Sequence, residues 1–85
     1  MQEKQQQQLI DSVALLKLAN EMIVEHQQYL PGMQATSVEQ RDDVLIFKGE
    51  YFLDADGLPT ADTTAVFNVF KALAVALSPH YRLSE

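Results

Sequence analysis

The carboxylates that could do chemistry in this 85-residue chain gather in one stretch, Asp54-Ala55-Asp56-Gly57, with Asp62 a few residues further on. Oxygen ligands that alternate before a glycine are typical of the calcium-binding EF-hand loop. If this glycine took the EF-hand position, the first ligand would fall on Phe52 and the closing carboxylate on Thr63. Neither side chain can serve there. The pattern therefore excludes an EF-hand and leaves a looser cation site at the three aspartates as an alternative.

Catalysis by paired carboxylates would need a cleft that holds two acids beside a substrate. Asp54, Asp56 and Asp62 have no recognisable basic or nucleophilic partner in the sequence. No serine or threonine lies in a nucleophile-elbow pattern, and no glycine-rich loop could cradle a phosphate. The chain has no cysteine, which excludes disulfides and thiolate chemistry. We therefore predict no catalytic residue, metal or cofactor, and an acidic turn whose side chains bond nearby backbone N–H groups.

The two histidines are isolated from each other and from the aspartates. A lone histidine lacks the partners that a metal site or an activated nucleophile needs. His26 falls inside the apolar arc of a predicted helix, so we expect a structural histidine that is hydrogen-bonded to a backbone carbonyl. His80 follows Pro79 near the C-terminus and is expected to be exposed.

The first helix is predicted to begin after an N-cap at Asp11, to run to about Tyr29 and to be stopped by Pro31-Gly32. Ile10 and Leu15 occupy the two positions of a hydrophobic staple. Lys17, Asn20, Glu21, Glu25 and Gln28 are expected to point away from the core, and the apolar face comprises Leu15, Leu16, Ala19, Met22, Ile23 and Leu30.

The second helix is predicted to follow Pro59 and an N-cap at Thr60, with Asp62 in the first turn, where the helix dipole favours negative charge. Ser78-Pro79 ends its pattern. Its apolar stripe is the widest in the chain and should form the centre of the core: Val66, Val69, Phe70, Leu73 and Leu77.

Residues 33–40 and 44–53 are predicted to form two strands joined by the two-residue turn Asp42-Asp43. In that register Val38 lies opposite Phe47, and Gln40 lies opposite Leu45. The inner face then holds Leu45, Phe47, Tyr51 and Leu53, whereas Val44, Ile46 and Phe52 make the outer face half apolar. Gly49 splits the second strand, which predicts a bulge or a close backbone approach.

These elements predict an α+β fold: a single small domain, helix-strand-strand-helix, with an antiparallel β-hairpin packed against two helices. Residues 11–85 form that domain, and residues 1–10 form a flexible, polar, glutamine-rich N-terminal segment. Tyr81 and Leu83 could pack back onto the domain.

The run YFLDADGLPTADTTAVFNVFKALAVALS, with features further back at residues 15–20, 26 and 47–49, resembles the YciN family of small bacterial proteins of unknown function. The resemblance covers most of the chain after about Leu9. It implies no established activity, cofactor or catalytic residue, so there are no functional residues to carry over.

A formal net charge of −6 disfavours nucleic acid and anionic membranes as partners. The helix order is similar to that of double-stranded-RNA-binding domains, but residues 60–64 carry no lysine for the phosphates. The N-terminus has no apolar run of signal-peptide length, which predicts a soluble, cytoplasmic protein. Because Val44, Ile46 and Phe52 would form an exposed apolar patch on a two-stranded sheet, we expect an interaction surface for a homodimer or another protein.

Overall fold

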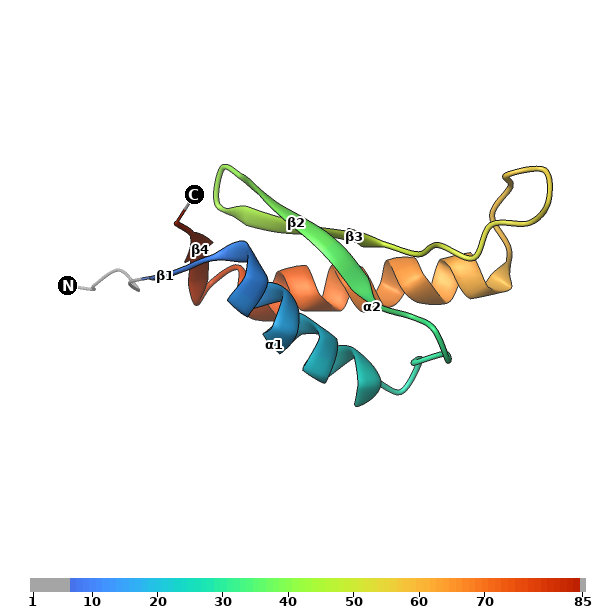
Figure 1. Cartoon of the computed structure of the whole chain (residues 1–85), viewed down its shortest axis with the longest axis horizontal. Helices are drawn as coiled ribbons and strands as arrows, with labels where there is room; N and C mark the ends of the chain where they lie inside the picture. Colours follow the sequence, from blue (N-terminus) through green and yellow to red (C-terminus); the bar gives the residue numbers. More distant parts are fainter. Residues whose placement is uncertain (1–6, 85) are drawn as a thin grey trace.

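The computed structural model describes residues 7–84. The elements along the chain are β1 (Gln8–Ile10), α1 (Ser12–Val24), β2 (Ala35–Arg41), β3 (Val44–Gly49), α2 (Ala61–Leu77) and β4 (Tyr81–Leu83). The antiparallel β2–β3 hairpin lies across the two helices, with β2 against α1 and β3 against α2 (Figure 1). The predicted α+β fold, with a hairpin packed against two helices, is confirmed.

The hairpin has the predicted turn and register. Asp42 takes a φ of 55°, a left-handed conformation that aspartate tolerates better than most residues. Val38 pairs with Phe47, and Gln40 pairs with Leu45. Leu45 and Phe47 are buried, so the face of the hairpin that was predicted to be inner covers the helices.

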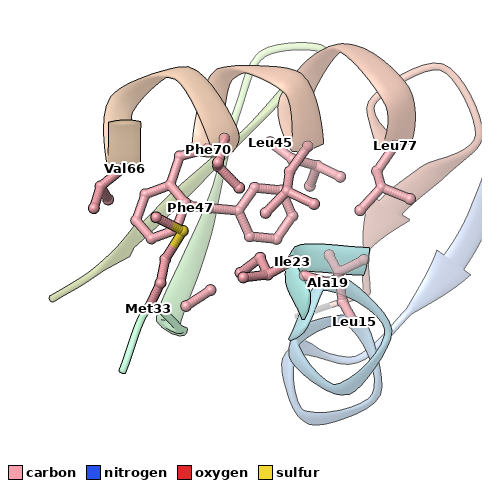
Figure 2. Close-up of a cluster of buried hydrophobic side chains, with 12 residues drawn as sticks. Leu15, Ala19, Ile23, Met33, Leu45, Phe47, Val66, Phe70 and Leu77 are labelled. Carbon is pink, nitrogen blue, oxygen red and sulfur yellow. The ribbon is translucent and has the colours of Figure 1, made fainter. Parts of the chain in front are cut away.

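The core lies between the hairpin and the two helices, and Figure 2 shows Phe70 and Leu77 of α2 pointing towards Ile23, Ala19 and Leu15 of α1. All five residues of the predicted α2 stripe are buried. Leu16, which was also expected in the core, is only half-buried, whereas Leu15, predicted on the same apolar face, is fully buried. Met33 and Phe47 fill the space beneath β3.

Both predicted helix N-caps are present. The Asp11 carboxylate accepts the Ala14 N–H at 2.9 Å. Thr60 and Thr63 form a reciprocal capping box at the start of α2, and the fully buried Thr63 hydroxyl also donates to the Tyr51 carbonyl at 2.6 Å. This last bond ties the end of the strand region to the first turn of α2.

The predicted end of the first helix was wrong, because α1 stops at Val24 and not near Tyr29. The Glu25 and His26 N–H groups bond three residues back, to Met22 and Ile23, which tightens the chain out of the α-helix. The His26 Nδ1 then accepts the Gln28 N–H at 3.0 Å. His26 is therefore half-buried in a turn after the helix, and its ring bonds a backbone N–H instead of the expected carbonyl.

The second strand is also shorter than predicted, since β3 ends at Gly49. Phe52 has a φ of 55°, which breaks the alternation of a strand. Phe52 consequently packs against the core near Gly32 and does not continue the outer face, while Leu53, expected inside, is half exposed.

Asn20 was expected to point into solvent but bridges α1 and β2. Its side-chain amide donates to the Ala35 carbonyl at 3.0 Å, and its side-chain oxygen accepts the Ala35 N–H at 2.8 Å. One side chain thus satisfies both polar backbone groups at the start of β2. The amide therefore holds that strand in place over the helix.

A second, parallel pair of strands was not predicted: β1 and β4 pair through Gln8–Tyr81, Leu9–Arg82 and Ile10–Leu83. This pairing gives Tyr81 and Leu83 the packing role that the sequence suggested. The sequence predicted a flexible segment at residues 1–10 and did not anticipate strand β1 within it. Residues 1–6 of that segment lie outside the described part of the chain.

Replacement of Phe70 should expose how far the fold depends on the α2 stripe. Phe70 is 6% exposed, so we expect Phe70→Ala to lower the free energy of unfolding by about 3–5 kcal/mol in chemical denaturation. Phe67→Ala is the matched control, since Phe67 is 53% exposed and its loss should cost about 1 kcal/mol or less. Equal losses in both variants would contradict this placement of the core.

The close approach predicted at Gly49 is present and is testable. A Cβ at Gly49 would collide with the Gln34 carbonyl oxygen and lie 3.1 Å from the Phe70 ring. Gly49→Ala should therefore force a backbone shift and cost more than the ~1 kcal/mol expected for Gly57→Ala. Gly57 has positive φ but open space around it, so thermal melting of the two variants separates steric overlap from backbone strain.

Candidate functional site

The acidic turn that first suggested chemistry is held together by its own backbone. The Asp54 carboxylate accepts the Asp56 N–H and the Leu58 N–H, each at 2.9 Å. The Asp54 N–H also donates to the Leu58 carbonyl, and the Gly57 N–H donates to the Asp54 carbonyl. The carboxylate of Asp54 is thus the cap of a tight loop, as the sequence suggested for these side chains.

Asp54, Asp56 and Asp62 are all exposed. Among residues 7–84, no three histidine, cysteine, aspartate or glutamate side chains are arranged to hold a metal ion. His80 is exposed, as expected, and His26 lies in its own turn. The structure thus does not bring the titratable residues selected from the sequence into one group.

The outer edge of β3 offers a different kind of site. The two-residue turn makes Arg41–Val44 a hydrogen-bonded pair, and pairs then alternate along an antiparallel ladder. Leu45 and Phe47 therefore direct their N–H and C=O groups away from β2. The Leu45 N–H confirms this direction, since it donates to the Ser78 hydroxyl at 2.9 Å. No hydrogen bond outside the hairpin ladder reaches the Phe47 N–H within residues 7–84.

A shallow groove of about 190 Å³ runs along this edge. Its walls are apolar except for one charge, and they comprise Val44, Leu45, Ile46, Phe47, Phe70, Lys71 and Ala74. The groove lies between β3 and the side of α2, so a strand lying in it would contact both elements. We call this site, the outward backbone of Leu45 and Phe47 with the groove beside it, the β3 edge.

The structure brings together only part of the predicted interaction surface. Val44 is 48% exposed and lines the groove with the half-buried Ile46. Phe52 is not part of it, because it lies beyond the end of β3 and packs near Gly32.

The outer face of the hairpin is less apolar than the sequence suggested, because Ile46 pairs with Glu39. Glu39 lies 2.9 Å from the Arg41 guanidinium and 3.7 Å from the Lys48 ammonium. The hydrogen bond from Arg41, followed by the charge of Lys48, lowers the pKa of the Glu39 carboxyl. Two cations thus surround one anion on the outer face of the hairpin, in a chain that is acidic overall.

Sequence reasoning missed several contributors to this site. Ser78 was assigned only to the end of the helix, but its hydroxyl also covers the first outward N–H of β3. Phe67 and Val75 remain 53% and 68% exposed on α2, and with Lys71 they recur at four-residue spacing. That spacing, outside the buried stripe, was the available signal of a second helix surface.

Comparison with known proteins places the chain in a family. A family model described as "Protein of unknown function (DUF2498)" matches residues 6–84. The chain belongs to this family. The protein named "Protein YciN" from Escherichia coli strain K12 is 56% identical over 78 residues, covering 92% of this chain and 94% of the relative. The proteins of the same name from the O6:H1 and O157:H7 strains match to the same extent.

Membership of DUF2498 confirms the resemblance deduced from the central run of the sequence. The family description assigns no activity, so no residue role passes from it to this chain. Neither helix within residues 7–84 is long and apolar enough to span a bilayer.

A test of the acidic turn separates a structural cap from a cation site. Asp54→Ala should destabilise the protein by about 1 kcal/mol, because two loop N–H groups lose their acceptor. Asp56→Ala, the matched control, removes a carboxylate of the same loop and should leave the melting temperature nearly unchanged. Millimolar calcium, magnesium or manganese should not shift the melting curve of the wild-type protein, whereas stabilisation by metal that Asp56→Asn abolishes would establish a cation site.

Proposed function

We propose that this DUF2498 protein is a non-catalytic protein–protein interaction module whose β3 edge accepts an additional strand. The observation that carries this proposal is the outward Phe47 N–H, which has no hydrogen-bond partner within residues 7–84 and lies beside an apolar groove. Strand addition uses main-chain hydrogen bonds for affinity and neighbouring side-chain pockets for specificity. The β3 edge offers both within one short segment.

The restricted length of this edge supports a docking role. Ser78 covers the Leu45 N–H at one end, and β3 ends at Gly49 at the other. Proteins commonly blunt edge strands with short length, covering groups and lysines so that they do not aggregate. Leu45 has no exposed surface and Phe47 is 4% exposed, so the only outward N–H without a partner along β3 within residues 7–84 is that of Phe47. With Lys71 in the groove beside it, such a restricted edge fits one defined partner better than unlimited strand pairing.

The alternative function, a small-ligand, cation-binding or enzymatic domain built on Asp54, Asp56 and Asp62, has weaker support. Asp54 uses its carboxylate to cap its own loop. The groove along β3 is lined by apolar side chains and one lysine, with no nucleophile and no carboxylate. Its side chains suit contact with a protein surface better than they suit proton transfer.

The experiment compares three tagged baits in a native bacterial extract: the wild-type chain, Ile46→Lys and Val13→Lys. Ile46→Lys places a charge in the groove, whereas Val13 is 75% exposed on α1 and serves as the matched control. We expect proteins retained by the wild type and by Val13→Lys to be lost with Ile46→Lys.

Amide hydrogen exchange on a recovered complex then decides whether the bound protein lies on the edge. The Phe47 amide has no hydrogen-bond partner in the free chain within residues 7–84, so it should exchange more slowly in the complex, where it gains a backbone acceptor. Retention that is independent of Ile46, or a Phe47 amide that exchanges equally in both states, would refute a strand-accepting edge.

A further inference from the structure

We infer that the exposed side of α2, where Phe67, Lys71 and Val75 form one ridge, binds a helix of another protein that carries a carboxylate within its apolar stripe. We call this surface the α2 ridge. The inference goes beyond the proposed function, because it concerns α2 and does not depend on the addition of a strand to β3. Four properties of the ridge indicate the partner: its composition, its rigidity, its backbone and its charge.

The α2 ridge is apolar where an exposed helix surface is normally charged. Residues 63–77 contain one charged side chain, Lys71, although 21% of the whole chain is charged. The stripe on the opposite side of the helix is already buried in the core, yet Phe67 and Val75 are 53% and 68% exposed. A helix that is apolar on all sides is typical of a buried helix, so the ridge has the composition of a surface that a partner covers.

The exposed ring of Phe67 is held in place before any partner binds. It lies 5.4 Å from the ring of Tyr51, which in turn lies 5.9 Å from the ring of the buried Phe70. These aromatic contacts connect the exposed ring to the core. An aromatic side chain whose conformation is already fixed loses little conformational entropy on binding, which is the property of an interface anchor.

The backbone of α2 indicates what kind of segment can bind. From Phe67 to Ala74 the N–H and C=O groups are paired along the helix, so the ridge offers no backbone group to a strand or a loop. A segment buried against the ridge must therefore satisfy its own backbone, and an α-helix does so. Side chains at four-residue spacing also form the ridges that pack between the ridges of a facing helix.

Lys71 adds a chemical requirement to that helix. None of its neighbours three or four residues away along α2 is acidic. The cations of the hairpin, Arg41 and Lys48, lie beside the carboxylate of Glu39, but Lys71 forms no ion pair within residues 7–84. A partner without a carboxylate would bury this ammonium unpaired, at a cost that weakens binding. The partner helix must therefore place an aspartate or a glutamate opposite Lys71, between the apolar side chains that cover the rest of the ridge.

A second copy of this chain does not meet that requirement. In an antiparallel contact centred on the ridge, Lys71 would face Lys71, Phe67 or Val75 of the other copy, and none of these is acidic. The single carboxylate of α2, Asp62, lies nine residues before Lys71. Pairing these two residues would leave Val75 beyond the start of the other α2, because that helix begins at Ala61. The ridge is thus complementary to an acidic partner and not to itself.

Photo-cross-linking of the full chain in bacterial cells tests the α2 ridge. Phe67 is replaced by the photoreactive amino acid benzoylphenylalanine, and in the matched control Val24, 54% exposed on α1, is replaced in the same way. We expect position 67 to link to another protein far more strongly than position 24 does. The linked segment, identified by mass spectrometry, should be an amphipathic helix with an aspartate or a glutamate in its apolar stripe.

Charge reversal then tests the role of Lys71. Lys71→Glu in the labelled chain should reduce the linked product roughly tenfold or more, because two carboxylates would face each other. Lys17→Glu changes the net charge equally at an exposed position of α1 and should leave the product unchanged. Replacement of the partner's carboxylate by lysine should restore the product with Lys71→Glu. Melting curves establish that each variant is folded.

Several results would overturn the inference. The two labelled positions could link equally, or the product could join two copies of this chain or contain a lipid. The linked segment could lack a helix or a carboxylate, and Lys71→Glu could give the same yield as Lys17→Glu. The Phe47 amide plays no part in this test, so its failure would leave the strand-accepting edge standing, and failure of that edge would leave the α2 ridge standing.

Discussion

The burial of the α2 stripe beneath β3 is the interaction on which the rest of the structure depends. A two-stranded hairpin is barely stable alone and needs a helix or further strands on one face. Leu45 and Phe47 supply that face, and Phe70 and Leu73 of α2 fill it from below. α1 completes the layer with Leu15, Ala19 and Ile23. Because both helices lie on the same face, no helix or strand covers the opposite face of the hairpin within residues 7–84.

Three polar side chains form hydrogen bonds with backbone groups that neighbouring strands would pair with in a larger sheet. Asn20 bonds both backbone groups of Ala35 at the start of β2. Ser78 accepts the N–H of Leu45 near the start of β3, and Thr63 donates to Tyr51 just past its end. A buried backbone group without a hydrogen-bond partner costs free energy. Each of these bonds therefore stabilises a backbone group that has no partner in the β2–β3 ladder. The Phe47 N–H, between Ser78 and Thr63 along the edge, has no such side chain.

The sequence was sufficient for the elements whose signals are local. The caps at Asp11 and Thr60, the turn at Asp42 and the spacing of the α2 stripe each depend on residues close in sequence. The failures were of two kinds. Two were local: α1 ends early where the Glu25 and His26 N–H groups bond three residues back, and the positive φ of Phe52 ends the strand alternation, although neither residue type indicates this. The third was distant, since the pairing of β1 with β4 joins segments about 70 residues apart, beyond the reach of any periodicity.

The candidate site was likewise predictable only in part from the sequence. Val44 and Ile46 were identified because an apolar outer face on a short hairpin is unusual, and both line the groove. The outward direction of the Phe47 backbone beside this groove follows from the ladder register and from the bond between Leu45 and Ser78, which the sequence did not indicate. Phe47 was selected as a core side chain, and its side chain is indeed buried. The Phe47 side chain therefore anchors the hairpin, while its backbone belongs to the proposed docking site. A variant that removes the side chain would unfold that site before any binding could be measured, so the proposed binding role has to be examined through Ile46.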